Sequence, residues 1–156
     1  MPFPISKLFV TITDINHYYF AEMLRQLSAL DVRLLSMFKN HRTTYALCDV
    51  QEFSDGHITP YKHSLFDFQD KNCEFSDKER LALTPSLENL IRLGLVLKNR
   101  AIIQLGYNYE NFKNTSLYSF FLQTKTTPES DLSIIPARIE LTDLGNKFVS
   151  FFNINQ

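Results

Sequence analysis

Two cysteines and two histidines are the side chains best suited to hold a metal, because thiolates and imidazoles together form many zinc sites. They are Cys48, His57, His63 and Cys73. Their spacing matches no zinc-finger pattern, and isolated residues of these types usually pack in a core or lie on the surface. The sequence therefore predicts no metal site, and we expect no cofactor of any kind.

A catalytic centre is the second kind of chemistry to consider. An unconventional nuclease could be assembled from His57, Asp67 and Lys71, because such sites form in space and not along the chain. The sequence has no nucleophile-elbow, zinc-protease or phosphate-loop motif, and it has only 4 glycines. An acidic stretch lacks the glycine and the last glutamate of a calcium loop, which indicates a solvated face or helix starts. It comprises Asp67, Asp70, Glu74, Asp77 and Glu79. We expect a protein that is not an enzyme.

Four residues are candidates to contact nucleic acid or a protein partner: Asn89, Arg92, Lys98 and Arg100. Amide and guanidinium groups read base edges, and cations neutralise phosphates. On the helix predicted over 85–93, however, Glu88 adds a charge that repels the phosphate backbone. The chain has 16 basic and 17 acidic side chains, so any attraction to nucleic acid must be local. This balance favours a protein-facing or structural role over DNA binding.

The stretch from Lys98 to Lys125 mixes four basic residues, one acid and six aromatic rings. Such a surface could stack and neutralise single-stranded nucleic acid. Aromatic residues at near-helical spacing more often fill a core or a dimer seam. With 14 Phe and 7 Tyr in 156 residues, the chain has more apolar surface than one small core needs, which predicts a homo-oligomer.

Hydrophobic periodicity predicts the elements that must position these residues. Residues 16–27 carry one apolar stripe, which indicates an amphipathic helix. Ser28 and Asp31 resemble a capping box and predict a second helix that stops near Asn40. Residues 43–53 are rich in strand formers, whereas the pattern dissolves from Ser54 to Phe75, which predicts a strand and then a long loop.

The second half begins with another capping box, Ser76 to Glu79, which predicts a short helix. Thr84-Pro85 predicts the start of a further helix, because Thr caps and Pro suits the first helical position. That helix is expected to end at Gly94. The remaining expected elements are a helix over 108–123, a strand from Ile134 to Leu141 and a last helix capped by Thr142.

The segment after Gly94 predicts a hairpin wing. Leu95 to Leu97 and Ala101 to Leu105 indicate two short strands around a turn at Lys98-Asn99-Arg100, or one strand with a kink. A helix that leads through glycine into such a hairpin is the order of a winged helix. We therefore expect an α+β, winged-helix-like domain with additional N-terminal helices and a helical insertion near the wing.

Length and composition indicate a single domain over 1–156. We divide it into N-terminal helices (1–40), a strand and loop (41–75) and a winged-helix-like half (76–156). The 2 cysteines suit a reducing compartment, and the N-terminal residues show no signal-peptide pattern. No apolar run is long enough to cross a membrane, so we expect a soluble cytoplasmic protein.

Three segments together carry a resemblance to a known family: LSALDVRLLSMF, LENLIRLGLV and IELTDLGNKFVSFF. The sequence resembles the abortive-infection alpha (Abi-alpha) family of bacterial proteins at Leu27 to Leu35, Asn89 to Leu95 and Leu141 to Phe148. The resemblance implies a role in bacterial defence against phage, with no assigned reaction and no catalytic residues to transfer. Combined with the residues above, it predicts an interaction module that binds itself or another protein. A winged-helix transcription regulator that binds DNA is the alternative.

Overall fold

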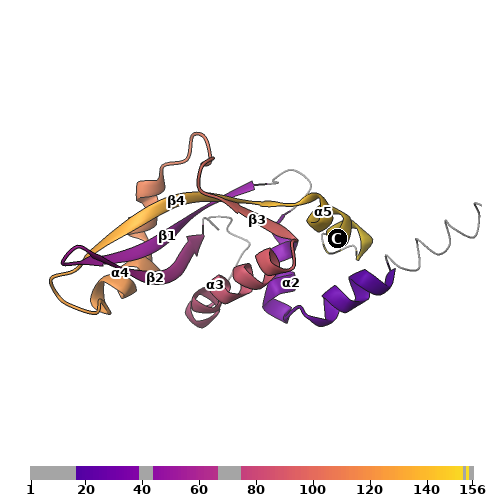
Figure 1. The fold of residues 1–156 in the computed structure, drawn as a ribbon, viewed down its shortest axis with the longest axis horizontal. Helices are drawn as coiled ribbons and strands as arrows, with labels where there is room; N and C mark the ends of the chain where they lie inside the picture. The colour runs from indigo at the N-terminus through magenta and orange to yellow at the C-terminus, as the bar shows by residue number, and fades with distance from the viewer. Residues whose placement is uncertain (1–16, 39–43, 67–74, 153, 155–156) are drawn as a thin grey trace, which may run out of the picture.

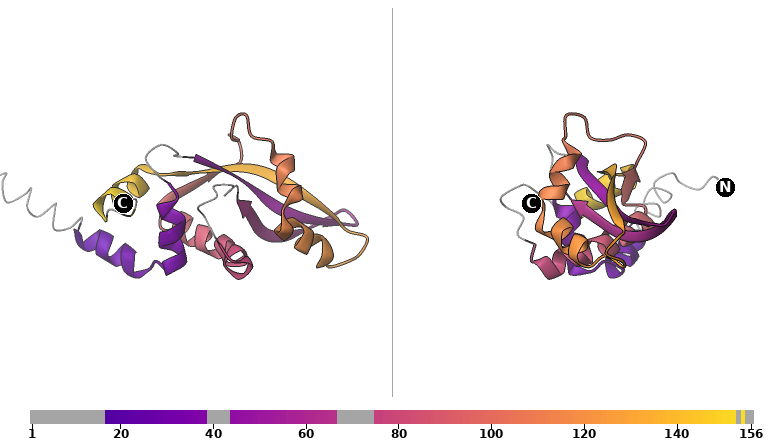
Figure 2. Two further views of the ribbon diagram at one scale, coloured as in Figure 1. Left: turned by 180° about the vertical axis from the view of Figure 1, so that it is seen from behind. Right: turned by 90° about the vertical axis from the view of Figure 1, so that its left-hand side faces the viewer.

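The computed structural model of the chain describes residues 17–38, 44–66, 75–152 and 154, and Figure 1 draws its ribbon. Four antiparallel strands form one sheet in the order β2-β1-β4-β3. They are β1 (Thr44–Ser54), β2 (His57–Phe66), β3 (Val96–Asn99) and β4 (Asp131–Leu141). Helices lie against both faces of this curled sheet (Figure 2), so the α+β class is confirmed.

A tight hairpin joins β1 to β2. Asp55 and Gly56 have φ angles of 48° and 77°, the left-handed pair that a two-residue hairpin turn requires. Ser54 faces His57 across the turn. The predicted loop from Ser54 is therefore wrong as far as Phe66, and the rest of it, 67–74, lies outside the described residues. An edge strand such as β2 has a neighbour on one side only, which permits its polar and Pro-containing sequence.

Strand β1 confirms the strand predicted over 43–53, and it is buried from Tyr45 to Val50 because both of its faces are covered. Successive side chains of a strand point to opposite faces. Tyr45 and Leu47 enter the first core, which α2 (Ala29–Ser36), α3 (Asp77–Arg92) and α5 (Asp143–Phe151) cover. Ala46, Cys48 and Val50 enter the second core, which η1 (Tyr109–Asn114) and α4 (Ser116–Gln123) cover. The aromatic-rich composition thus fills two cores instead of one.

The N-terminal helices agree with the sequence. The first helix covers 17–25 and α2 covers Ala29–Ser36. The Ser28 side chain accepts a hydrogen bond from the backbone N–H of Asp31, and the Asp31 carboxylate accepts one from the backbone N–H of Ser28. This reciprocal capping box confirms the predicted helix start. The predicted stop at Asn40 lies outside the described residues.

Helix α3 (Asp77–Arg92) is one helix and not the two that were predicted. Its capping box at Ser76 and Glu79 is confirmed, but Pro85 lies inside it. Leu83, Leu87 and Leu90 continue one buried face past the proline, so packing outweighs the hydrogen bond that proline cannot make. Thr84 does not start a helix; its Oγ1 accepts the backbone N–H of Ser64 on the edge strand, at 2.9 Å.

The predicted end of this helix at Gly94 is confirmed. Gly94 has a φ of 74°, its N–H donates to the carbonyl of Ile91, and the N–H of Leu95 donates to that of Leu90. This is the Schellman pattern, which glycine favours because it has no Cβ. The chain then passes directly into β3, which pairs with β4.

The predicted wing hairpin is wrong. Only Val96–Asn99 forms a strand, and residues 101–108 form a loop. The Oδ1 of Asn99 accepts the N–H groups of Ala101 and Ile102, which turns the chain out of the sheet. The topology of the described residues does not confirm a winged helix.

Two helical segments follow the loop where one helix was predicted over 108–123. They are η1, a 3₁₀ helix (Tyr109–Asn114), and α4 (Ser116–Gln123), with Thr115 capping α4. Strand β4 contains the predicted strand and begins three residues earlier, at Asp131. Helix α5 (Asp143–Phe151) has Thr142 as its N-cap, as predicted. No helix in the described part of the chain combines the length and the apolar character needed to cross a membrane.

Candidate functional site

Asp49 gathers two of the four residues that the sequence analysis selected. Its Oδ1 is 2.5 Å from the Nζ of Lys98, and its Oδ2 is 2.5 Å from the Nη2 of Arg100. The hydroxyl of Ser64 also donates to Oδ1, at 2.7 Å. Burial raises the pKa of this carboxyl, but the hydrogen bonds from Lys98, Ser64 and Arg100 outweigh burial and hold the pKa below its ordinary value. Asp49 is therefore an anion at neutral pH that neutralises part of the local positive charge.

The other two selected residues, Asn89 and Arg92, bind the junction between the first helix and α2. The amide of Asn89 donates to the carbonyl of Gln26 and to Asp31, each at 3.0 Å. The guanidinium of Arg92 donates to Asn89 at 2.8 Å and to the side chain of Gln26 at 3.1 Å. These polar groups connect α3 to the N-terminal helices, so their first role is structural.

The structure therefore divides the four residues between two networks. Asn89 and Arg92 meet Asp31 and Gln26, whereas Lys98 and Arg100 meet Asp49. A DNA-reading surface needs amide and cationic groups that are available to bases and phosphates. Of the two cations that contact Asp49, Arg100 is the more exposed, with 59% of its side chain accessible against 18% for Lys98.

The aromatic residues between Lys98 and Lys125 mostly fill the second core. Tyr109, Phe112, Tyr118 and Phe121 are buried there against the sheet, as the core alternative predicted. The cations interleaved with them are also engaged. Lys113 pairs with Glu110 at 2.6 Å, and Lys125 donates to the carbonyls of Pro128 and Ser130.

The three metal candidates that the structure describes, Cys48, His57 and His63, do not form a ligand set. Cys48 is buried in the second core, and burial followed by the neighbouring Asp49 raises the pKa of its thiol to about 12. A neutral thiol is a poor nucleophile and a poor metal ligand. His57 lies exposed at the hairpin, and His63 stacks on Phe121 with ring centroids 4.7 Å apart. Burial lowers the pKa of His63.

Several candidate residues lie outside the described part of the chain. They are Cys73 of the zinc set, Asp67 and Lys71 of the nuclease set, and Asp67, Asp70 and Glu74 of the acidic stretch. Within the described ranges, no three His, Cys, Asp or Glu side chains come together as metal ligands would. Glu79 is engaged in the α3 capping box and also pairs with Arg33.

Glu52 is a buried carboxylate that the sequence analysis did not select. It accepts hydrogen bonds from the Ser130 hydroxyl and from the Thr126 N–H and hydroxyl, the latter two at 2.8 and 2.9 Å. The bond from Ser130 is the main reason that its pKa lies below the ordinary value. Glu52 therefore fastens the turn between α4 and β4 to β1, a structural role that satisfies a buried charge.

The loop between β3 and η1 exposes large aliphatic side chains. Ile102, Ile103 and Leu105 are 51%, 43% and 92% exposed. Polar contacts nevertheless fix the loop: the N–H of Gln104 donates to the Tyr109 hydroxyl at 2.9 Å, and that hydroxyl donates to a β4 carbonyl. We call residues 101–106 the aliphatic loop. A defined loop that presents apolar groups to water is suited to contact another molecule.

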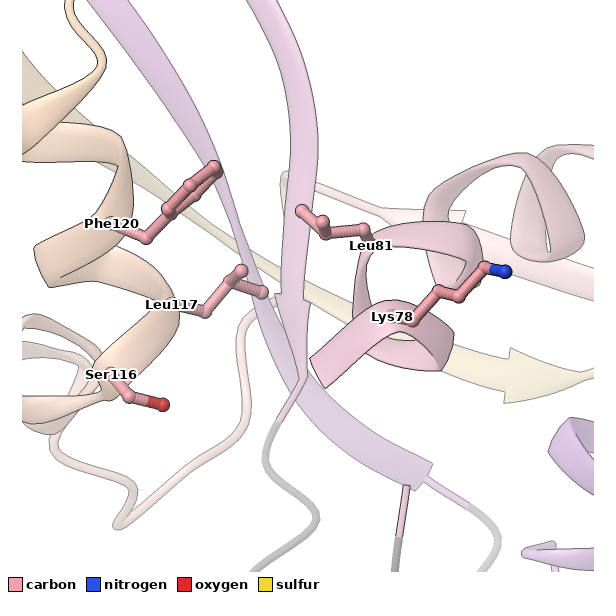
Figure 3. A pocket seen from close by; sticks show the side chains of 5 residues that line it. All are labelled: Lys78, Leu81, Ser116, Leu117 and Phe120. Atoms are coloured by element: carbon pink, nitrogen blue, oxygen red, sulfur yellow. The ribbon is translucent and has the colours of Figure 1, made fainter. Parts of the chain in front are cut away.

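An apolar pocket lies between the start of α3 and α4 (Figure 3). It encloses about 360 Å³ and is lined by Lys78, Leu81, Ser116, Leu117 and Phe120. Leu81 on α3 points toward Leu117 and Phe120 on α4, whereas the Lys78 amine points away from them. We call this the α3–α4 pocket. Its walls offer shape and apolar contact, and they offer no group aligned for acid–base or nucleophilic chemistry.

Neither apolar feature was predicted from the sequence. Ala101 to Leu105 is rich in apolar and β-branched residues, a composition that favours a strand. The absence of a facing partner strand could not be read locally. The pocket joins residues of α3 and α4 that are far apart in the chain, and exposure of Phe120 beside buried Phe121 follows only from the α4 orientation.

Comparisons with known proteins give a family and a fold. The model of the family described as abortive infection alpha matches residues 9–151. A solved structure of an uncharacterized protein from the hydrocarbon-degrading marine bacterium Alcanivorax borkumensis SK2 is 17% identical, with a TM-score of 0.55. The match covers 91% of this chain and 97% of that one, and it shows a shared fold. No curated protein matches the sequence.

Proposed function

Because the chain belongs to the abortive infection alpha family, we propose that it acts in bacterial defence against phage as a non-enzymatic interaction module in the cytoplasm. The observation that carries this proposal is the aliphatic loop, whose Leu105 is 92% exposed although the loop is fixed by hydrogen bonds. Single exposed aliphatic residues are common, but three within one ordered loop favour contact with a partner.

The partner that we propose is a further copy of this chain. The number of aromatic residues does not by itself support self-association, because two cores bury most of the described rings. Exposed aliphatic side chains take their place as the motive. The formal net charge of −1 adds little repulsion between copies.

In this proposal, the half of the chain from α3 to α5 contacts a protein partner and not DNA. A winged-helix regulator that binds DNA would use Arg92, Lys98 and Arg100, and each of these donates to a protein acceptor. Duplex DNA titrated at low and high salt distinguishes the two functions. A regulator binds at low salt and weakens steeply as salt rises, and Arg92→Glu abolishes that binding.

A phage-challenge assay tests the defence role. Bacteria that express the chain are infected, and plating efficiency and survival are compared with cells that carry an empty vector. We expect protection from the parent chain, loss with Leu105→Asp, and retention with Ile58→Asp, a control on the exposed β2 side of the hairpin. Equal plating on both hosts across a panel of phages would refute the defence role. Protection that survives Leu105→Asp would separate defence from the aliphatic loop.

A further inference from the structure

The aliphatic loop and the α3–α4 pocket are complementary in character. The loop presents three branched aliphatic side chains, Ile102, Ile103 and Leu105. The pocket is walled by two leucines and a phenylalanine and encloses about 360 Å³, which exceeds the volume of one leucine side chain. Both features leave apolar surface in water, and contact between them would remove that surface from water.

The two features lie on opposite sides of the molecule. In each view of Figures 1 and 2 the loop that follows β3 projects at the top, and α3, which forms one wall of the pocket, lies at the bottom. A chain therefore cannot insert its loop into its own pocket. A loop that reaches a pocket must belong to a different copy, and the contact then joins unlike surfaces of the two copies.

We propose that the aliphatic loop of one copy inserts Leu105 into the α3–α4 pocket of the next copy, in a head-to-tail contact. This inference rests on the proposed self-association and names its surfaces. Leu105 supplies the anchor because, among the residues that the structure describes, it is the most exposed large apolar one. Phe120 and Leu81 receive it from the two walls, at 45% and 36% exposure. Because the contact leaves a free loop at one end and a free pocket at the other, further copies can add.

Complementation between two variants tests this geometry. Leu105→Asp removes the loop anchor but keeps the pocket, and Phe120→Asp blocks the pocket but keeps the loop. Each variant alone should be monomeric by sedimentation velocity and light scattering from about 10 µM to about 1 mM, with association weakened at least ~10-fold. An equimolar mixture should form one-to-one dimers and nothing larger, because only one intact loop and one intact pocket can meet.

Controls separate this contact from misfolding and from other surfaces. Circular dichroism must show parent-like spectra, and Leu81→Lys on the opposite wall replaces Phe120→Asp if α4 is disturbed. Ile58→Asp, which is 57% exposed on β2, should associate like the parent. An association that survives both loop and pocket variants overturns the inference and leaves self-association intact.

The remaining outcomes also decide. A mixture that stays monomeric refutes insertion of loop into pocket, because the mixture contains one intact loop and one intact pocket that should bind each other. A parent chain that is monomeric throughout the concentration range refutes the self-association itself and the inference with it. The last experiment is co-sedimentation with vesicles that contain anionic phospholipid. If the parent is monomeric and sediments with the vesicles, and Leu105→Asp does not, the loop binds a lipid surface and not a second copy.

Discussion

Replacing Gly145 with alanine should destabilise the protein, although alanine is the better helix former. Gly145 lies in the first turn of α5, where the helix starts against the backbone of Leu95, the residue before β3. A Cβ built on it would lie 2.9 Å from the carbonyl carbon of Leu95 and still closer to the carbonyl oxygen. These are backbone atoms, so no side-chain rotation relieves the overlap. The helix must move away from the strand.

That movement weakens the junction that positions α5. The N–H of Thr142 donates to the carbonyl of Leu95 at 3.1 Å, and the Thr142 hydroxyl donates to the carbonyl of Gly94 at 2.5 Å. Overpacking costs about 1–3 kcal/mol, and each lost hydrogen bond costs about 1 kcal/mol. Alanine returns about 1 kcal/mol of helix propensity. We expect a net loss of about 2–4 kcal/mol, which lowers Tm by roughly 5–15 °C in a domain of this size.

Thermal and urea unfolding of the purified variant measure this loss. Gly94→Ala is the matched control, because its Cβ meets only a leucine methyl at 3.8 Å and its cost of about 1 kcal/mol comes from the φ of 74°. Gly145→Ala should be clearly the less stable of the two. A Gly145→Ala protein as stable as the parent, or more stable, would refute the close approach of α5 to β3.

Three further predictions concern buried polar groups. Asp49→Asn leaves the Lys98 ammonium without its anion and should lower the free energy of unfolding by about 3 kcal/mol in urea titrations; adding Lys98→Met should recover part of it. The pKa values of Asp49 and Glu52 are lowered in the folded state, so the stability that these carboxylates contribute is complete above about pH 5 and is lost as the pH falls below about 4. In the Glu52→Gln variant, the free energy of unfolding should therefore decrease less between about pH 5 and acid pH than in the parent. The Cys48 thiol, with its pKa raised to about 12, should not react with a thiol reagent at pH 8 in a Cys73→Ser background until the chain unfolds in urea.

Helix boundaries were predictable where the signal is contained in a few consecutive residues. The capping boxes at Ser28 and Ser76, the Thr142 cap and the Gly94 stop all appear in the structure as expected. Each depends on a side chain bonding a backbone group within the same turn, or on a φ that glycine favours. Packing elsewhere in the fold does not alter such contacts.

Elements that depend on distant partners were not predictable in this way. Strand β2 is polar because it is an edge, and its pairing with β1 could be inferred only from the Asp55-Gly56 turn. Residues 101–105 have strand-like composition but no neighbour to pair with, since β3 ends at Asn99. Pro85 was expected to mark a boundary, and the buried face of α3 carried the helix past it.

The same distinction decides which residues were selected as a site. A sequence shows that Lys98 and Arg100 are cations. Only the fold shows that both form ion pairs with the buried carboxylate of Asp49, which lies about fifty residues earlier in the chain. Asn89 and Arg92 are similarly engaged at the Gln26 junction. When intramolecular acceptors occupy the polar candidates, the surface left for a partner is the apolar one. Leu105 and Phe120 are therefore better targets than these four polar residues for finding the contact through which this chain acts.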